Sequence, residues 1–211
     1  CVVQCRMAIY DSLFSVALGT MNPAHDSSTL QAALKRTHAE LNNAILKLTA
    51  HDQLMRQQIT YARMSFFVIA AQALYNDLIA HAIRVLDEHR DATSFWYIVK
   101  CNESVARRAA QDSHLDLEAL KTLSSKLRHV REKTHFHIDK KSIKDSRSVW
   151  KDADIKGSDL AHALRAMAAT AARIKMELFG GDLDEVTEYD GSDIEKIVKA
   201  FEAVHGSVHG A

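Results

Sequence analysis

The chain has 211 residues, of which 47% are hydrophobic and 26% are charged, a composition typical of a globular domain rather than of a disordered or fibrous chain. Its 27 basic and 27 acidic residues cancel, so no overall charge draws it to nucleic acid or to an anionic membrane, and any basic surface has to be local. A single proline and seven glycines leave few residues for the turns of a β-rich fold. We therefore expect an all-α protein.

The cysteines indicate a reducing environment. Cys1, Cys5 and Cys101 are too few and too unevenly spaced for a disulfide framework, and no second pair completes a zinc site. We therefore expect a cytoplasmic protein without a bound metal or other cofactor. The chain begins with Cys1 rather than methionine, which is typical of a trimmed or fragmentary start.

Four long segments carry apolar residues at the 3.6-residue period of an amphipathic helix, and we expect an antiparallel four-helix bundle. They cover residues 27–50, 54–89 and 114–141, and a fourth segment runs from the capping residue Ser158 to Gly180. The expected core positions are Leu30, Leu34, Leu41, Ile45 and Leu48 in the first segment, Met64, Phe67, Ala71, Leu74, Leu78, Ala82 and Val85 in the second, Leu117, Leu120, Leu127, Val130 and Thr134 in the third, and Leu160, Leu164, Met167, Ala171, Ile174 and Leu178 in the fourth. The third segment is expected to begin near Ser113, with Asp116 three residues later as in a capping box.

The second segment is the most apolar part of the chain, but Gln72, Asn76, Asp77, His81 and Arg84 interrupt it. A membrane span requires about 20 nearly uninterrupted apolar residues, so we expect a helix buried in protein and no contact with a membrane. Asp77 and His81 lie one helical turn apart. Because the sequence places no serine or cysteine nucleophile beside them, we expect a hydrogen-bonded structural pair rather than a catalytic dyad.

Shorter helices at residues 2–18, 95–109 and 192–205 are expected to flank this core. The acidic run 182–190 is typical of a solvated linker. We accordingly expect a helical bundle over residues 1–181, followed over residues 182–211 by the linker and a C-terminal helix packed on or beside the bundle.

The third segment ends in a cluster of cations. Between Lys126 and Lys141 the basic and imidazole side chains outnumber the acids, and Lys144 and Arg147 extend the cluster. Contacts with RNA phosphates require such a local basic surface. Basic residues also gather at helix C-termini, where they favour the negative end of the helix dipole, so charge alone leaves both interpretations open.

Within this cluster, residues 131–139 read REKTHFHID and follow the pattern R-x-K-x-x-x-H-x-D. They resemble the Arg-x(4–6)-His signature of HEPN domains, in the form found in the AbiU-like abortive-infection branch. Upstream, AIRVLD at residues 82–87 and the following Thr93-Ser94 resemble that branch's alanine-rich helix, which ends in an R-x-L-D element before a short segment that starts with serine. The resemblance covers residues 60–140, together with the helical layout as far as residue 179, and implies a HEPN-like helical bundle.

The resemblance implies a metal-independent endoribonuclease related to toxins or phage defence, in which the ribose 2′-hydroxyl attacks the adjacent phosphate and leaves a cyclic phosphate. It assigns Arg131 as the phosphate clamp and His137 as the acid–base group, since a guanidinium is permanently charged and an imidazole exchanges protons near neutral pH. The supporting residues are Glu132, Lys133, His135 and Asp139, and the RNA contacts are Arg128, Lys140, Lys141 and Lys144. A homodimer, an RNA substrate and a cognate antitoxin are the implied partners.

The bare Arg-x(4–6)-His spacing also occurs at Arg84/His89, Arg107/His114, Arg108/His114 and Arg128/His135. Lys133, Asp139 and the position on the third segment select Arg131/His137 from this set. On an α-helix, six residues correspond to about 600° of rotation and about 9 Å of rise, so these two side chains would point about 120° apart. A site shared by two protomers about a two-fold axis would bring both to one phosphate, which is a second reason to expect a homodimer.

Two alternatives remain open at this stage. Many members of the resembled branch have Asn, Asp or His after the arginine, whereas this chain has Glu132, whose charge repels phosphate; this favours a non-catalytic module that binds a nucleotide or a protein partner. The H-x-H-x-D spacing of His135, His137 and Asp139 also occurs in metal sites. It suits a strand better than a helix, where only His135 and Asp139 share a face, so we do not expect a metal.

Overall fold

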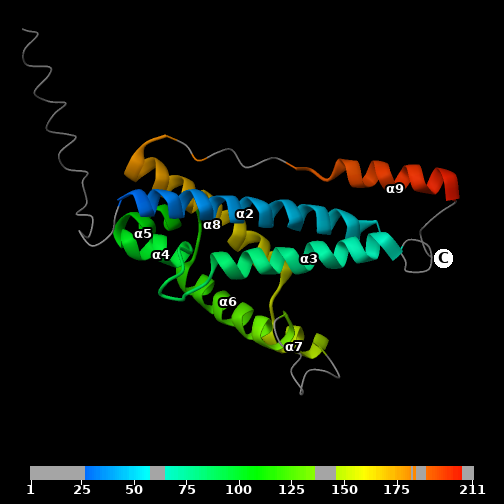
Figure 1. Cartoon of the computed structure of the whole chain (residues 1–211), viewed down its shortest axis with the longest axis horizontal. Coiled ribbons are helices and arrows are strands. Elements are labelled where there is room, and N and C mark those ends of the chain that lie inside the picture. The colour runs from blue at the N-terminus through cyan, green and yellow to red at the C-terminus, as the bar shows by residue number, and fades with distance from the viewer. Residues whose placement is uncertain (1–26, 58–64, 136–145, 182, 184–188, 206–211) are drawn as a thin grey trace, which may run out of the picture.

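Every regular element in the described part of the chain is a helix (Figure 1). This computed structural model describes residues 27–57, 65–135, 146–181, 183 and 189–205. The all-α expectation is confirmed for these residues. The predicted helix over residues 2–18 lies outside them.

The hydrophobic core is built around α2 (Ser27–Arg56). α3 (Ser65–Val85) runs antiparallel beside α2, and α8 (Gly157–Phe179) also packs along it (Figure 1). The fully buried side chains include Leu30, Leu34 and Leu41 from α2, Leu78 and Ile79 from α3, and Leu164, Met167 and Ile174 from α8. Burying one such side chain stabilises the fold by about 1.5–3 kcal/mol. The apolar period therefore predicted the central core positions of α2 and α8 correctly.

The predicted helix over residues 95–109 is in fact two helices, α4 (Phe95–Cys101) and α5 (Glu103–Asp112). Asn102 separates them, and its side-chain oxygen accepts a hydrogen bond from the Val105 N–H at 3.3 Å. An asparagine in this position caps a new helix instead of continuing the previous one. α5 then packs against α8.

α6 (Leu117–Val130) is shorter at both ends than the predicted segment 114–141. The carboxylate of Asp116 accepts hydrogen bonds from the N–H groups of Glu118 and Ala119, at 2.9 and 3.0 Å. Asp116 therefore caps the helix, in place of the expected Ser113. After Val130 the chain continues as a π-helical turn, η1 (Arg131–His135). No proline or glycine marks this change in the sequence, which is why the apolar period overran it.

The end of α6 packs against α7 (Ser146–Ala153). The sequence patterns did not predict this short helix. Val130 is fully buried in a small cluster with Val149 and Ala153 of α7. α7 also contacts η1, so one short helix packs on both the end of α6 and the π-helical turn that continues it.

The regular four-helix bundle stays a prediction. α3 and α8 each pack along α2. α6 contacts α3 over only a short length, near the C-terminal end of α3 (Figure 1). From there α6 diverges from the α2–α3 pair (Figure 1).

α3 differs from its prediction in both extent and burial. The predicted start at residue 54 is wrong, because α2 continues through Arg56 and α3 begins at Ser65. Its C-terminal half is packed in the core, but Phe66 and Ile69 near its start are exposed. By length and composition α3 could cross a membrane, with a mean hydropathy of 1.4 over 18 residues, and only 28% of that window is buried. In its C-terminal half, His81 and Arg84 contact the buried Glu40 of α2.

The boundaries of the last two helices are well predicted, with one exception. α8 ends at Phe179 and is followed by Gly180 at φ 65°, as expected for a left-handed residue that stops a helix. Its predicted start is two residues too late, since Lys156 is the N-cap and Ser158 already lies inside the helix.

α9 (Ser192–His205) has the predicted bounds. Val198 is buried against Phe67 of α3 and Phe201 of α9 itself. Gln53 of α2 donates a hydrogen bond from Nε2 to the Asp190 carbonyl at 3.2 Å. The C-terminal helix therefore contacts the end of the α2–α3 pair that lies opposite α4 and α5 (Figure 1).

Candidate functional site

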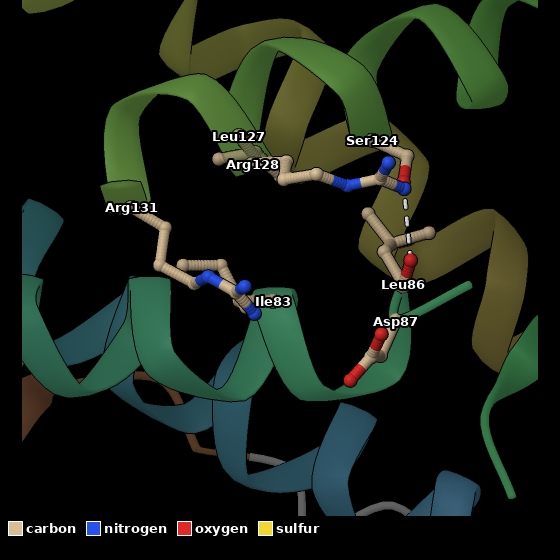
Figure 2. A pocket seen from close by; sticks show the side chains of 7 residues that line it. All are labelled: Ile83, Leu86, Asp87, Ser124, Leu127, Arg128 and Arg131. Carbon is tan, nitrogen blue, oxygen red and sulfur yellow. Dashed lines mark hydrogen bonds between the residues drawn. The ribbon is translucent and has the colours of Figure 1, made fainter. Parts of the chain in front are cut away.

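Two cations of the predicted site, the RNA contact Arg128 and the phosphate clamp Arg131, lie on one face of α6 and η1. Arg128 and Arg131 are three residues apart and line the same cleft, with Leu86 and Asp87 from the end of α3 on its other side (Figure 2). The cleft encloses only about 10 Å³, which is the space of about one water molecule. A ligand would therefore meet these arginines at the mouth of the cleft rather than inside it.

Acidic groups that directly follow α3 border this cleft, and sequence reasoning did not foresee them. Arg128 pairs with Glu88, with 3.2 Å between Nη2 and Oε1, and Asp87 lies across from Arg131 (Figure 2). The buried Ser124 hydroxyl lies 3.0 Å from the Leu86 carbonyl and 3.1 Å from Glu88, so it ties α6 to the end of α3. Residues about 40 positions apart in sequence are brought together here, and no local pattern indicates that.

The π-helical turn changes the geometry expected for the motif. An i→i+5 turn is wider than an α-turn, so the α-helical rotation assumed for the motif does not hold over Arg131–His135. Glu132 is exposed, while Arg131 and Lys133 are half-buried. Single π-helical turns occur frequently at functional sites, where they redirect side chains.

The second half of the predicted site lies outside the described residues. This holds for His137, Asp139, Lys140, Lys141 and Lys144, and for the side chain of His135. The approach of Arg131 and His137 to one phosphate therefore stays a prediction. So does the H-x-H-x-D metal alternative, although among the described residues no three histidine, cysteine or acidic side chains gather as metal ligands would.

A second polar cluster lies between α2 and α3. The carboxylate of the buried Glu40 contacts His81 Nδ1 at 2.5 Å, Arg84 Nε at 3.0 Å and Arg36 Nη2 at 2.6 Å. Asp77 lies 3.7 Å from His81 Nε2, so the two are neighbours as expected, but this distance is too long for the expected hydrogen bond, and the closer partner of His81 is Glu40. No local pattern pointed to Glu40, which is 41 residues from His81 in the chain.

Hydrogen bonding determines the charge of this cluster. Burial raises the pKa of Glu40, but hydrogen bonds from His81 and Arg84 outweigh it and hold the pKa below its usual value, so Glu40 is ionised. His81 Nδ1 lies within hydrogen-bond distance of both Glu40 and Arg84 Nη2, the latter at 2.8 Å. One ring nitrogen cannot donate to a carboxylate and accept from a guanidinium at once. Beside an ionised Glu40, Nδ1 carries the proton, and Arg84 Nη2 is left to other acceptors.

No family model matches the chain, and no curated protein or solved structure shows a significant match to it. The resemblance to HEPN domains therefore rests on the motif residues themselves.

Proposed function

We propose that the protein is a metal-independent endoribonuclease of the HEPN type, related to toxins or phage defence, that acts in the cytoplasm as a homodimer. The observation that carries the proposal is the cleft that Arg128 and Arg131 share at the start of the basic segment. Arg131 is also the first residue of the π-helical turn. Two guanidinium groups on one face are suited to neighbouring phosphates of an RNA strand, because each can donate two hydrogen bonds to a phosphate.

In the proposed reaction, His137 accepts the proton of a ribose 2′-hydroxyl, whose oxygen attacks the adjacent phosphorus. The bond from phosphorus to the 5′-oxygen breaks, and that oxygen takes up a proton as it leaves. The products are a 2′,3′-cyclic phosphate and a 5′-hydroxyl. Arg131 stabilises the negative charge that builds on the phosphate oxygens in the transition state. Lys140, Lys141 and Lys144 would hold the RNA backbone on either side.

One observation favours a second candidate, a non-catalytic module that binds a nucleotide or a protein partner. Asp87, Glu88 and the exposed Glu132 place negative charge around the arginines. These carboxylates reduce the attraction of the cleft for phosphate. They would also suit a basic partner such as an antitoxin segment.

The test is incubation of the purified protein with a mixed RNA pool in the presence of EDTA, beside the variants His137→Ala and His129→Ala. His129 is exposed on α6 and lies outside the Arg131/His137 pair, so it is the matched control. We expect cleavage by the wild-type protein and by His129→Ala, with cyclic phosphate ends. His137→Ala should be slower by about a hundredfold or more, which is the usual contribution of an acid–base group.

Cleavage that persists in His137→Ala would indicate another nuclease and contradict the proposal. If neither protein cuts but RNA or a nucleotide still binds, the non-catalytic candidate is supported. Inhibition by EDTA would point instead to metal-dependent chemistry and to the H-x-H-x-D residues.

A further inference from the structure

A separate pocket lies on the α2 side of the end of α3, where Ile83 and Asp87 face α6 but Arg84 faces α2. It is lined by Arg36, Thr37 and Glu40 from α2, by Arg84 and Val85 from α3, and by Ala92, Thr93 and Ser94 before α4. Its volume is about 140 Å³. Pockets that enclose a drug-sized ligand usually measure about 300–1,000 Å³, so this one suits a single small group.

Glu40 fixes two guanidinium groups at this pocket. One carboxylate oxygen holds Arg36 Nη2 at 2.6 Å, and the other holds Arg84 Nε at 3.0 Å. The carboxylate is buried, whereas the side chains of Arg36 and Arg84 are 72% and 52% exposed. Each guanidinium has five N–H donors, and these contacts leave several unused on each. The two cations and one anion carry a net charge of about +1.

Ser94 supplies a third hydrogen-bond donor to this pocket. The residue is only 4% exposed, yet it lines the pocket. Although Ser94 occupies the N-cap position of α4, its side chain makes no capping hydrogen bond, and its hydroxyl has no other hydrogen-bond partner among the described residues. Because Ser94 lines the pocket, its hydroxyl can donate to an acceptor that enters from outside. The neighbouring Thr37 hydroxyl, in contrast, donates to the Thr93 carbonyl at 3.3 Å.

We propose that this pocket binds a phosphate group, held by Arg36 and Arg84 and completed by the Ser94 hydroxyl. A tetrahedral oxyanion offers acceptors to all three residues, matches the net positive charge and suits the small volume. Because Glu40 already orients both guanidiniums, little conformational entropy remains to be lost on binding. None of the three residues belongs to the Arg131/His137 motif, so this proposal does not depend on the ribonuclease activity.

The experiment is a calorimetric titration of the full chain with inorganic phosphate, with uridine 5′-monophosphate and with uridine, at constant ionic strength set by chloride. We expect saturable binding of the two phosphate-bearing probes and none of uridine. Ser94→Ala and Arg36→Gln should each weaken binding roughly tenfold, the usual loss for a hydrogen bond to a charged group. Inorganic phosphate as good as the nucleotide would indicate a free anion as ligand, and preference for the nucleotide would indicate a phosphate ester.

Arg107→Gln is the matched control, because Arg107 is also exposed and also pairs with a glutamate four residues away, at 2.6 Å. It should leave binding unchanged. Ser94→Ala removes a hydroxyl without a partner, so it should fold normally, which circular dichroism and thermal unfolding would check. Absence of saturable phosphate binding, equal binding of uridine, or equal weakening by Arg107→Gln would each overturn the proposal.

Discussion

At the scale of single residues, we expect substitution of Glu40 to lower the free energy of unfolding more than substitution of any other charged residue. Glu40→Ala leaves His81 and Arg84 without their shared carboxylate, and we expect a loss of about 2–3 kcal/mol in the free energy of unfolding at pH 7. Urea denaturation measures it. Glu103→Ala, which removes an exposed partner of Arg107, should cost less than about 1 kcal/mol. Similar losses for both variants would contradict a structural role for the Glu40 cluster.

The effect of Glu40 should depend on pH with a definite sign. Its pKa in the folded protein lies below the usual value of 4.5, because the hydrogen bonds from His81 and Arg84 outweigh the effect of burial. A depressed carboxyl pKa stabilises the fold fully above the unfolded pKa and loses that contribution as the pH falls through the folded pKa. The difference in stability between the wild type and Glu40→Gln should therefore be constant at neutral pH and shrink below about pH 4.5. A difference that grew on acidification would show the opposite sign.

What the sequence predicted for single residues was limited to neighbours on one helix. The spacing of Asp77 and His81 correctly placed them within reach of each other, at 3.7 Å. Glu40 was missed because its distance from His81 depends on how α2 packs against α3, and no local period contains that information. Asp87 and Glu88 were missed at the candidate site for the same reason.

At the scale of elements, Gly191 controls how α9 is joined to α2. A Cβ atom at Gly191 would lie 2.3 Å from Gln53 Cγ, and its φ of 72° is strained for any other residue. Gly191→Ala should therefore weaken the packing of α9 by about 1–2 kcal/mol from backbone strain alone, with the contact adding to this. Hydrogen exchange of the α9 amides should become faster while that of α2 and α8 is unchanged. Gly157→Ala is the control, because nothing lies within 4 Å of its Cβ position.

Helix boundaries were predictable where a residue enforces them chemically. Gly180, in a left-handed conformation, ends α8 as expected. Where packing sets the boundary, as at Val130 beneath α7, the apolar period continued past the true end. The break at Asn102 lies between these cases, since asparagine favours a cap but is also tolerated within helices.

At the scale of the whole molecule, the apolar period predicted that helices pack together but not how they cross. The positions that face the core recur at 3.6 residues whichever neighbour covers them, so the same pattern fits a regular bundle and the divergent α6 that is observed. The candidate site was found through its motif letters. Its acidic border depends on the packing of α6 against α3, which the motif does not encode.

The proposed dimer leads to a prediction that no single protomer can satisfy. If each site takes Arg131 from one protomer and His137 from its partner, a heterodimer of Arg131→Ala and His137→Ala contains one intact site and one doubly substituted site. Purified through two different affinity tags, this heterodimer should recover roughly half of the wild-type cleavage rate, although each homodimeric variant is inactive. This result also requires that the protein is a dimer at micromolar concentration, which light scattering measures. If the heterodimer is as inactive as its parents while the wild type cleaves RNA, both residues act within one protomer, and the π-helical turn at Arg131–His135 would have to bring them together.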